Sequence, residues 1–236
     1  MKNIGLIGGM SWESSIEYYR IINQQVREAL GGVHSARSVM VSVDFGEIEK
    51  LQAAGDWEAA TRIMVQCAQE VEGAGADFIL ICTNTMHLMA EEVQEAIEIP
   101  LLHIADATAE HLTEKGIKTV GLLGTSFTME HDFYKGRLVE KYGLHVLVPD
   151  KKDRAIVHNV IYKELCMGTI IESSKKEYLR IIKSLSGQGA EAVILGCTEI
   201  GMLVTPHDTD ITLCDTAEVH AAKAVEYAIQ QSAIYE

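Results

Sequence analysis

The chain has 236 residues, 47% of them hydrophobic and 23% charged, and its 34 acidic and 20 basic side chains give a formal net charge of −14. This composition is typical of a globular protein with one large domain or two small ones. The negative charge disfavours binding to nucleic acid or to anionic membrane surfaces, and no apolar run reaches the ~18 residues of a membrane span.

Short apolar segments alternate with amphipathic segments along the chain, the pattern of a parallel α/β protein. A first series predicts strands at 3–8, 38–44 and 77–82 and helices at 14–30, 57–72 and 87–98. A second series starts at 100–104, with strands at 118–123, 145–148 and 192–195, helices at 128–141, 154–167 and 173–185, and a final strand and helix at 211–214 and 216–229.

An internal repeat divides the chain into two related halves. Residues 75–85 align without gaps on residues 189–199, and residues 4–8 resemble 120–124. We therefore expect two pseudo-symmetric α/β domains, 1–98 plus 212–236 and 99–211, each a parallel sheet flanked by helices. Ligands of such sheets bind beyond the carboxyl ends of the strands, so the active site is expected in the cleft between the domains.

Five cysteines lie in apolar surroundings without metal-ligand spacing, which predicts reduced thiols in a cytoplasmic protein and no metal site. The spacing of Gly5, Gly8 and Gly9 matches neither G-x-G-x-x-G nor G-x-x-x-x-G-K-[ST], the glycine motifs of nucleotide-binding sites. We therefore expect this segment to be a tight turn from strand to helix, either purely structural or with backbone N–H groups that hold a carboxylate.

Cys197 follows a buried apolar strand, and the repeat pairs it with Thr83. A thiol at such a strand end, beside helix N–H groups, is expected to have a lowered pKa, although a small core cysteine is the alternative. The three short polar residues 83–85 are hard to explain as core. His87 is expected to be a core or helix-start histidine, and the role of His103 stays open.

Four segments, 5–15, 83–87, 103–108 and 196–200, resemble the motifs of the aspartate/glutamate racemase family, whose members act without pyridoxal phosphate. The chain is most similar to the subgroup specific for L-aspartate and L-glutamate. The resemblance implies a homodimer, a small-molecule amino acid substrate, and no metal or organic cofactor. Family members carry a cysteine at both catalytic positions, whereas this chain has Thr83 at the first and Cys197 at the second.

The resemblance also implies roles for these residues. Cys197 is expected to remove the α-proton of the L-enantiomer, and Thr83 to supply a proton to the opposite face. Glu199 suits the substrate ammonium, Gln52 can hydrogen-bond a distal carboxylate, and Glu164 lies where a second group for that carboxylate is expected. The implied substrate-binding residues are Met10, Gln52, Asn84, Thr85, Thr198 and Glu199.

Two other functions remain as alternatives. The first is a single-cysteine decarboxylase or cis–trans isomerase of the same superfamily, which an achiral product would identify. The second is a non-catalytic protein that binds acidic amino acids, which would bind them without exchanging the α-proton.

Overall fold

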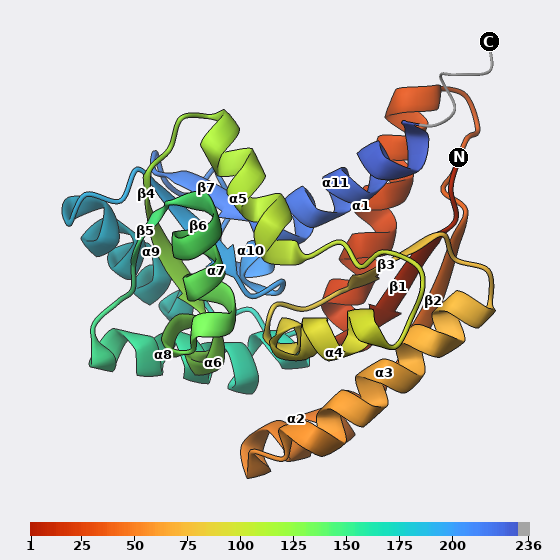
Figure 1. The fold of residues 1–236 in the computed structure, drawn as a ribbon. Helices are drawn as coiled ribbons and strands as arrows, with labels where there is room; N and C mark the ends of the chain where they lie inside the picture. Colours follow the sequence, from red (N-terminus) through yellow and green to blue (C-terminus); the bar gives the residue numbers. More distant parts are fainter. Residues whose placement is uncertain (231–236) are drawn as a thin grey trace. The chain divides into compact units, whose positions relative to one another are not determined.

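Two parallel β-sheets organise the chain, one in each of two α/β units (Figure 1). The computed structural model describes residues 1–230. Of the described residues, the first unit contains Met1–Ile104 and 220–230, and the second contains Ala105–Val219. This arrangement confirms the predicted fold class.

The sheet of the first unit has the strand order β2–β1–β3. Its strands are β1 (Ile4–Gly8), β2 (Ser38–Ser42) and β3 (Phe78–Ile81). The accompanying helices are α1 (Trp12–Leu30), α2 (Phe45–Ala54), α3 (Trp57–Gly73), the 3-10 helix η1 (Thr85–Met89), α4 (Ala90–Glu95) and α11 (Thr216–Ile229).

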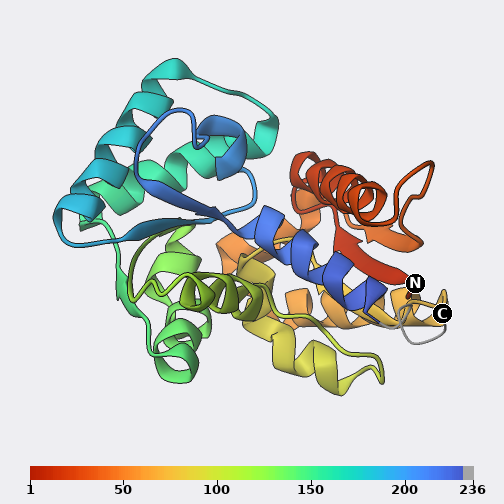
Figure 2. The same cartoon turned by 90° about the horizontal axis from the view of Figure 1, so that it is seen from above.

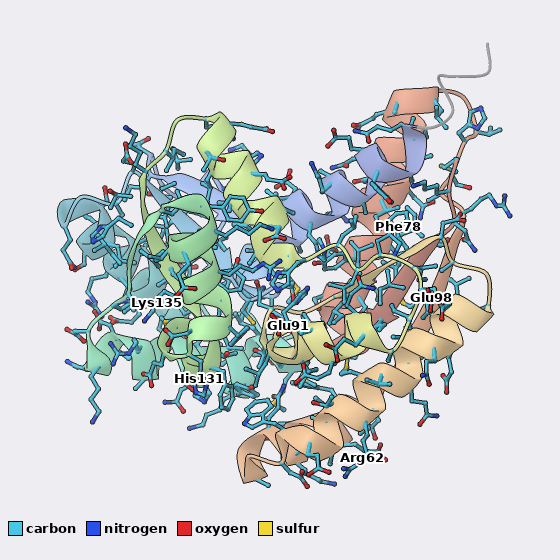
Figure 3. All side chains as sticks on the ribbon, in the orientation of Figure 1. Arg62, Phe78, Glu91, Glu98, His131 and Lys135 are labelled. Atoms are coloured by element: carbon cyan, nitrogen blue, oxygen red, sulfur yellow. The ribbon has the colours of Figure 1, made fainter. Side chains whose placement is uncertain are left out.

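Helices cover both faces of this sheet, as a parallel sheet requires (Figures 1 and 2). Ile79 and Ile81 face a core formed with α2, α3 and α4, while Phe78 points to the other side and stacks edge-on against Tyr227 of α11. On the outer face of α3, Arg62 points away from the sheet and pairs with Glu58 at 2.7 Å (Figure 3).

The sheet of the second unit has the order β5–β4–β6–β7. Its strands are β4 (Thr119–Gly124), β5 (His145–Leu147), β6 (Ala192–Gly196) and β7 (Thr212–Asp215). The helices are α5 (Ile104–Glu114), α6 (Ser126–Glu130), α7 (Asp132–Tyr142), α8 (Lys151–Lys163), the 3-10 helix η2 (Leu165–Met167), α9 (Glu172–Gly187) and α10 (Ile200–Leu203).

The internal repeat corresponds to equivalent pairing in the two sheets. In the first, Ile4 of β1 pairs with Phe78 of β3, and in the second Val120 of β4 pairs with Ala192 of β6. The repeat in the sequence joins the same pairs. Thr83 and Cys197 therefore occupy equivalent positions, each five residues after a strand residue, Phe78 or Ala192, that is paired in the same way in its sheet.

Several boundaries differ from those predicted. The units divide at 104/105 and 219/220 rather than at 98/99 and 211/212, because β7 pairs with β6 and residue Leu101 forms an isolated bridge with Ile79. Residues 100–104 are thus not a strand of the second sheet. Helix α2 was not predicted, and none of the described helices is long and apolar enough to cross a membrane.

Candidate active site

The first group of candidate residues follows β3 in the first unit. Thr83, Asn84 and Thr85 are all buried. His87 Nδ1 donates a hydrogen bond to the carbonyl of Thr83 at 2.8 Å, and His87 Nε2 accepts one from the N–H of Ile104 at 3.2 Å. Since both ring nitrogens bind backbone groups, His87 is a neutral histidine that holds the Thr83 segment in place.

Cys82 precedes Thr83 and does not belong to the polar group. Its side chain is fully buried, and that burial raises the pKa of its thiol far above the ordinary value. The strand β3 ends at Ile81 and residues 82–84 form a bend, so the packing of Cys82 does not by itself fix the direction of the Thr83 side chain.

Gln52 and Met10 lie in the first unit as well. Gln52 is buried on α2, and its Nε2 lies 3.2 Å from the sulfur of Met86. Met10 and Met86 both belong to the hydrophobic core between the sheet and α2–α4. The first unit thus brings the Thr83 segment, through Met86, into the same neighbourhood as Gln52.

The turn after β1 requires glycine. Gly9 has a φ of +92°, and a Cβ there would lie 2.3 Å from the carbonyl oxygen of Val43. The N–H of Gly9 donates to Ser15 Oγ at 2.8 Å, and this hydroxyl donates to the carbonyl of Ser11 at 2.9 Å. These bonds support the tight-turn interpretation of this glycine segment.

The second group of candidate residues follows β6 in the second unit. The thiol of Cys197 donates a hydrogen bond to Glu199 Oε2 at 2.9 Å, and Thr198 Oγ1 donates to the same oxygen at 3.2 Å. All three side chains are buried, with Glu199 only 1% exposed. The second unit therefore places a thiol and a carboxylate in direct contact.

This contact corrects the expectation of a lowered pKa for Cys197. Burial raises its pKa well above the ordinary value, and the negative charge of Glu199 raises it further. The following helix, α10, has only four residues, and Glu199 immediately before it places a carboxylate against the sulfur. Cys197 is accordingly a protonated thiol in this structure.

Two further groups, Tyr178 and Cys166, lie near Cys197. The hydroxyl of Tyr178 on α9 donates to the carbonyl of Val157 at 2.9 Å, and its pKa is raised first by burial and then by Cys197, Glu164, Cys166 and Glu199. Because η2 packs against α10, Cys166 lies near Cys197 and also raises its pKa. The sequence analysis singled out neither Cys166 nor Tyr178, since only the packing of α9 and η2 brings them here.

The donor set does not fit a metal ion. Among the described residues, no group of three or more histidine, cysteine or acidic side chains could hold one. Three histidine rings lie close together, with the ring centroid of His87 4.5 Å from that of His103 and 5.9 Å from that of His220. Both ring nitrogens of His87 and of His220 already form hydrogen bonds to groups of the first unit, so these two rings have no nitrogen left to bind a metal.

Comparisons with known proteins agree with this architecture. The family model described as Asp/Glu/Hydantoin racemase matches residues 7–224. The crystal structure of a proposed Asp/Glu racemase from Yersinia pestis is 52% identical, covers 98% of this chain and 100% of its own, and superposes with a TM-score of 0.90. The crystal structure of an aspartate racemase homologue from Pyrococcus horikoshii OT3 is 35% identical. It covers 97% of this chain and 99% of its own, and superposes with a TM-score of 0.83. The broad specificity amino-acid racemase RacX of Bacillus subtilis (strain 168) is 25% identical over 178 residues, 75% of this chain and 76% of RacX.

Proposed function

This chain belongs to the Asp/Glu/Hydantoin racemase family and is therefore an isomerase. We propose that it inverts the α-carbon of amino acids by two-base proton transfer, with Cys197 acting on one face of that carbon and Thr83 on the other. The observation that carries this proposal is the equivalence of the two residues, each buried just beyond a corresponding strand of its own sheet. L-Aspartate and L-glutamate are the substrates proposed first, and no organic or metal cofactor is required.

Cys197 acts on the L-enantiomer in this proposal. An α-proton beside a carboxylate is very weakly acidic, so a base must remove it while hydrogen-bond donors stabilise the charge that develops. The thiol proton of Cys197, which is hydrogen-bonded to Glu199 at 2.9 Å, is released to solvent as the substrate binds, and the resulting thiolate takes the α-proton. Glu199 also suits the substrate ammonium, whose positive charge favours formation of the thiolate.

Thr83 acts on the opposite face. Its hydroxyl is too weak an acid to begin as an alkoxide, but it can donate a proton to a carbanion that has already formed, and it then recovers a proton from solvent. The hydrogen bond from His87 to its carbonyl supports this role by fixing the backbone. Free enantiomers have equal free energies, so a racemase has equal kcat/KM in the two directions.

The remaining site residues bind the substrate in this scheme. Met10, Asn84, Thr85 and Thr198 surround the α-carboxylate and α-amino groups together with Glu199, and Gln52 hydrogen-bonds the distal carboxylate. Except for Glu199, these residues are uncharged.

We further propose that the protein is a cytoplasmic homodimer. Its five free thiols support a reducing compartment. The exposed apolar side chains of α1 support self-association, since Trp12 is 62%, Ile16 52% and Tyr19 55% exposed. Size-exclusion chromatography with light scattering tests the dimer, and a monomer at every concentration would contradict it.

Proton NMR in D₂O tests the reaction with L-aspartate, L-glutamate and their D-forms, with chirality assayed in parallel. Wild-type protein is expected to exchange the α-proton and to form the other enantiomer. Cys197→Ser is expected to lose both activities, whereas Thr83→Val is expected to keep exchange of the L-form and to lose inversion. Cys67→Ser, which changes a buried thiol on α3, is the matched control and should keep both.

Other outcomes would contradict the scheme. Full activity of Cys197→Ser would remove the thiol from the mechanism. An achiral product would instead identify the decarboxylase or cis–trans isomerase class, and binding without exchange would identify a non-catalytic binding protein.

A further inference from the structure

His87 connects Thr83 to the segment by which the chain leaves the first unit. The N–H of Ile104 donates to His87 Nε2 at 3.2 Å, so that nitrogen carries no proton, and the proton on Nδ1 is donated to the carbonyl of Thr83 at 2.8 Å. Ile104 is the last residue of the first unit before the chain enters the second, and it is fully buried. The position of the Thr83 backbone therefore depends on the position of residue 104.

His220 holds the same segment at the point where the chain returns to the first unit. Its Nε2 lies 2.8 Å from the carbonyl of Leu102, an oxygen that can only accept, so Nε2 carries the proton. The other nitrogen, Nδ1, then accepts a hydrogen bond from the hydroxyl of Tyr18 on α1 at 2.9 Å. Tyr18 and His220 are fully buried, and burial lowers the pKa of His220 to about 4, which keeps the ring neutral.

These four hydrogen bonds form one chain in which every donor points the same way. The chain starts at the hydroxyl of Tyr18, passes through His220 to residues 102–104, and continues from there through His87 to the carbonyl of Thr83. Each histidine has the tautomer that its two partners require, and the two tautomers are opposite. Removing one member leaves a buried donor or acceptor unpaired in the next, so the members stabilise one another.

The internal repeat places a glycine where the first unit has this histidine. The offset of 114 residues that pairs Thr83 with Cys197 also pairs His87 with Gly201. A Cβ at Gly201 would collide with the carboxylate of Asp215, so the second unit has no room for a side chain there. The two halves therefore differ in how they hold the segment after the equivalent strand, and the histidine belongs to the half that carries the threonine.

We propose that Tyr18, His220 and His87 are positioning residues for the proton donor of the proposed racemase, and that inversion depends on them more than α-proton removal does. This inference rests on the proposed function. A displacement of about 1 Å between reacting groups can lower a rate about a hundredfold, so a hydroxyl that must meet a carbanion needs a fixed backbone. The thiol of Cys197 is hydrogen-bonded to Glu199 in the second unit, so its reaction with the L-enantiomer should not need this chain.

The test measures, in D₂O, the rate at which L-aspartate or L-glutamate is inverted, divided by the rate at which the L-form exchanges its α-proton. This ratio does not depend on the amount of folded protein, so a merely structural defect leaves it unchanged. Tyr18→Phe removes only the first hydroxyl of the chain and is expected to lower the ratio about two- to tenfold, the factor that one hydrogen bond generally contributes. Tyr134→Phe is the matched control and should keep the ratio, because Tyr134 is equally buried and donates to Thr108 Oγ1 at 3.4 Å in the second unit.

Two substitutions of His87 test the other end of the chain. His87→Ala removes the bond to the Thr83 carbonyl and is expected to lower the ratio about tenfold to a hundredfold. His87→Asn should recover part of this loss, because an asparagine amide can donate from the position of Nδ1. An unchanged ratio in Tyr18→Phe, with or without a fall in both rates, would overturn the inference, and so would an equal fall of the ratio in Tyr134→Phe.

Nitrogen-15 NMR of the histidine rings gives a second reading that needs no turnover. The wild-type protein is expected to carry the ring proton on Nδ1 of His87 and on Nε2 of His220, and Tyr18→Phe is expected to shift the ring resonances of both. The reverse tautomer at either histidine, or an unshifted His87, would contradict the chain. Absence of exchange and of inversion with every amino acid in the wild type would instead refute the racemase proposal, and the spectra would still decide whether the chain reaches Thr83.

Discussion

Replacing Glu199 by glutamine is expected to make Cys197 more reactive. The substitution keeps the shape of the side chain and an oxygen that can accept the thiol hydrogen bond, but it removes the negative charge 2.9 Å from the sulfur. That charge opposes formation of the thiolate and is the second cause of the raised pKa, after burial. The pKa of Cys197 should therefore fall in Glu199→Gln, while burial, the larger cause, continues to raise it.

The size of the fall follows from the separation of the two charges. At 2.9 Å the repulsion between thiolate and carboxylate is about 1.4 kcal/mol at the dielectric constant of water and about 6 kcal/mol at an effective value of roughly 20. At about 1.4 kcal/mol for each pKa unit, the pKa falls by about one to four units. Each unit raises the thiolate population about tenfold and lowers its nucleophilicity about threefold, so alkylation accelerates about threefold per unit.

The assay is the rate of iodoacetamide alkylation at pH 8, followed at Cys197 by peptide mass spectrometry so that the other four thiols do not interfere. Glu199→Gln should react about 3 to about 100 times faster than wild type. Thr198→Val is the control, because it removes a hydroxyl that donates to the same carboxylate oxygen at 3.2 Å and keeps the charge. An unchanged rate in Glu199→Gln would refute the conclusion that Glu199 holds Cys197 in its thiol form.

Two further predictions concern stability. Gly5→Ala should lower the free energy of unfolding by about 1–3 kcal/mol, because the new Cβ would lie 2.3 Å from a methyl group of Val71. Gly73→Ala is the control and should not destabilise the protein, because the space around its Cβ is open. Urea unfolding measures both variants. Burial lowers the pKa of His220 to about 4 from an ordinary 6.5. The unfolded chain then binds the additional proton, so this histidine should remove about 2 kcal/mol of stability between pH 7 and pH 5, and His220→Gln should show a correspondingly smaller loss in urea unfolding. An equal pH dependence in both proteins would contradict that assignment.

The parallel sheets and their repeat were predictable because they depend on local pattern. Strands buried on both faces are continuous apolar runs, and the gapless match of 75–85 to 189–199 already implied equivalent strands and paired Thr83 with Cys197. The helix α2, which carries Gln52, was missed although its signals are present. Asp44 caps it by accepting from the N–H of Gly46 at 2.9 Å, and Gly55 ends it in a left-handed conformation.

The surroundings of Cys197 were less predictable because they depend on tertiary packing. Tyr178 and Cys166 are separated from it by 19 and 31 residues in the sequence, and neither has a local pattern that marks it. The sign of the pKa shift also depends on where one side chain points. The sequence places Glu199 two residues after Cys197, but only the folded turn brings its carboxylate within 2.9 Å of the sulfur.

The protonated state of Cys197 has a consequence for the proposed reaction. Because Cys197 is a thiol in the free protein, the thiolate that acts as the base must form when the substrate binds. The substrate itself carries a group that favours formation of the thiolate. An α-ammonium beside Glu199 cancels the negative charge that opposes the thiolate, which is electrostatically the same change as Glu199→Gln. In this scheme, substrate binding and formation of the base are one coupled step. Between turnovers the sulfur remains a thiol, the form least susceptible to oxidation.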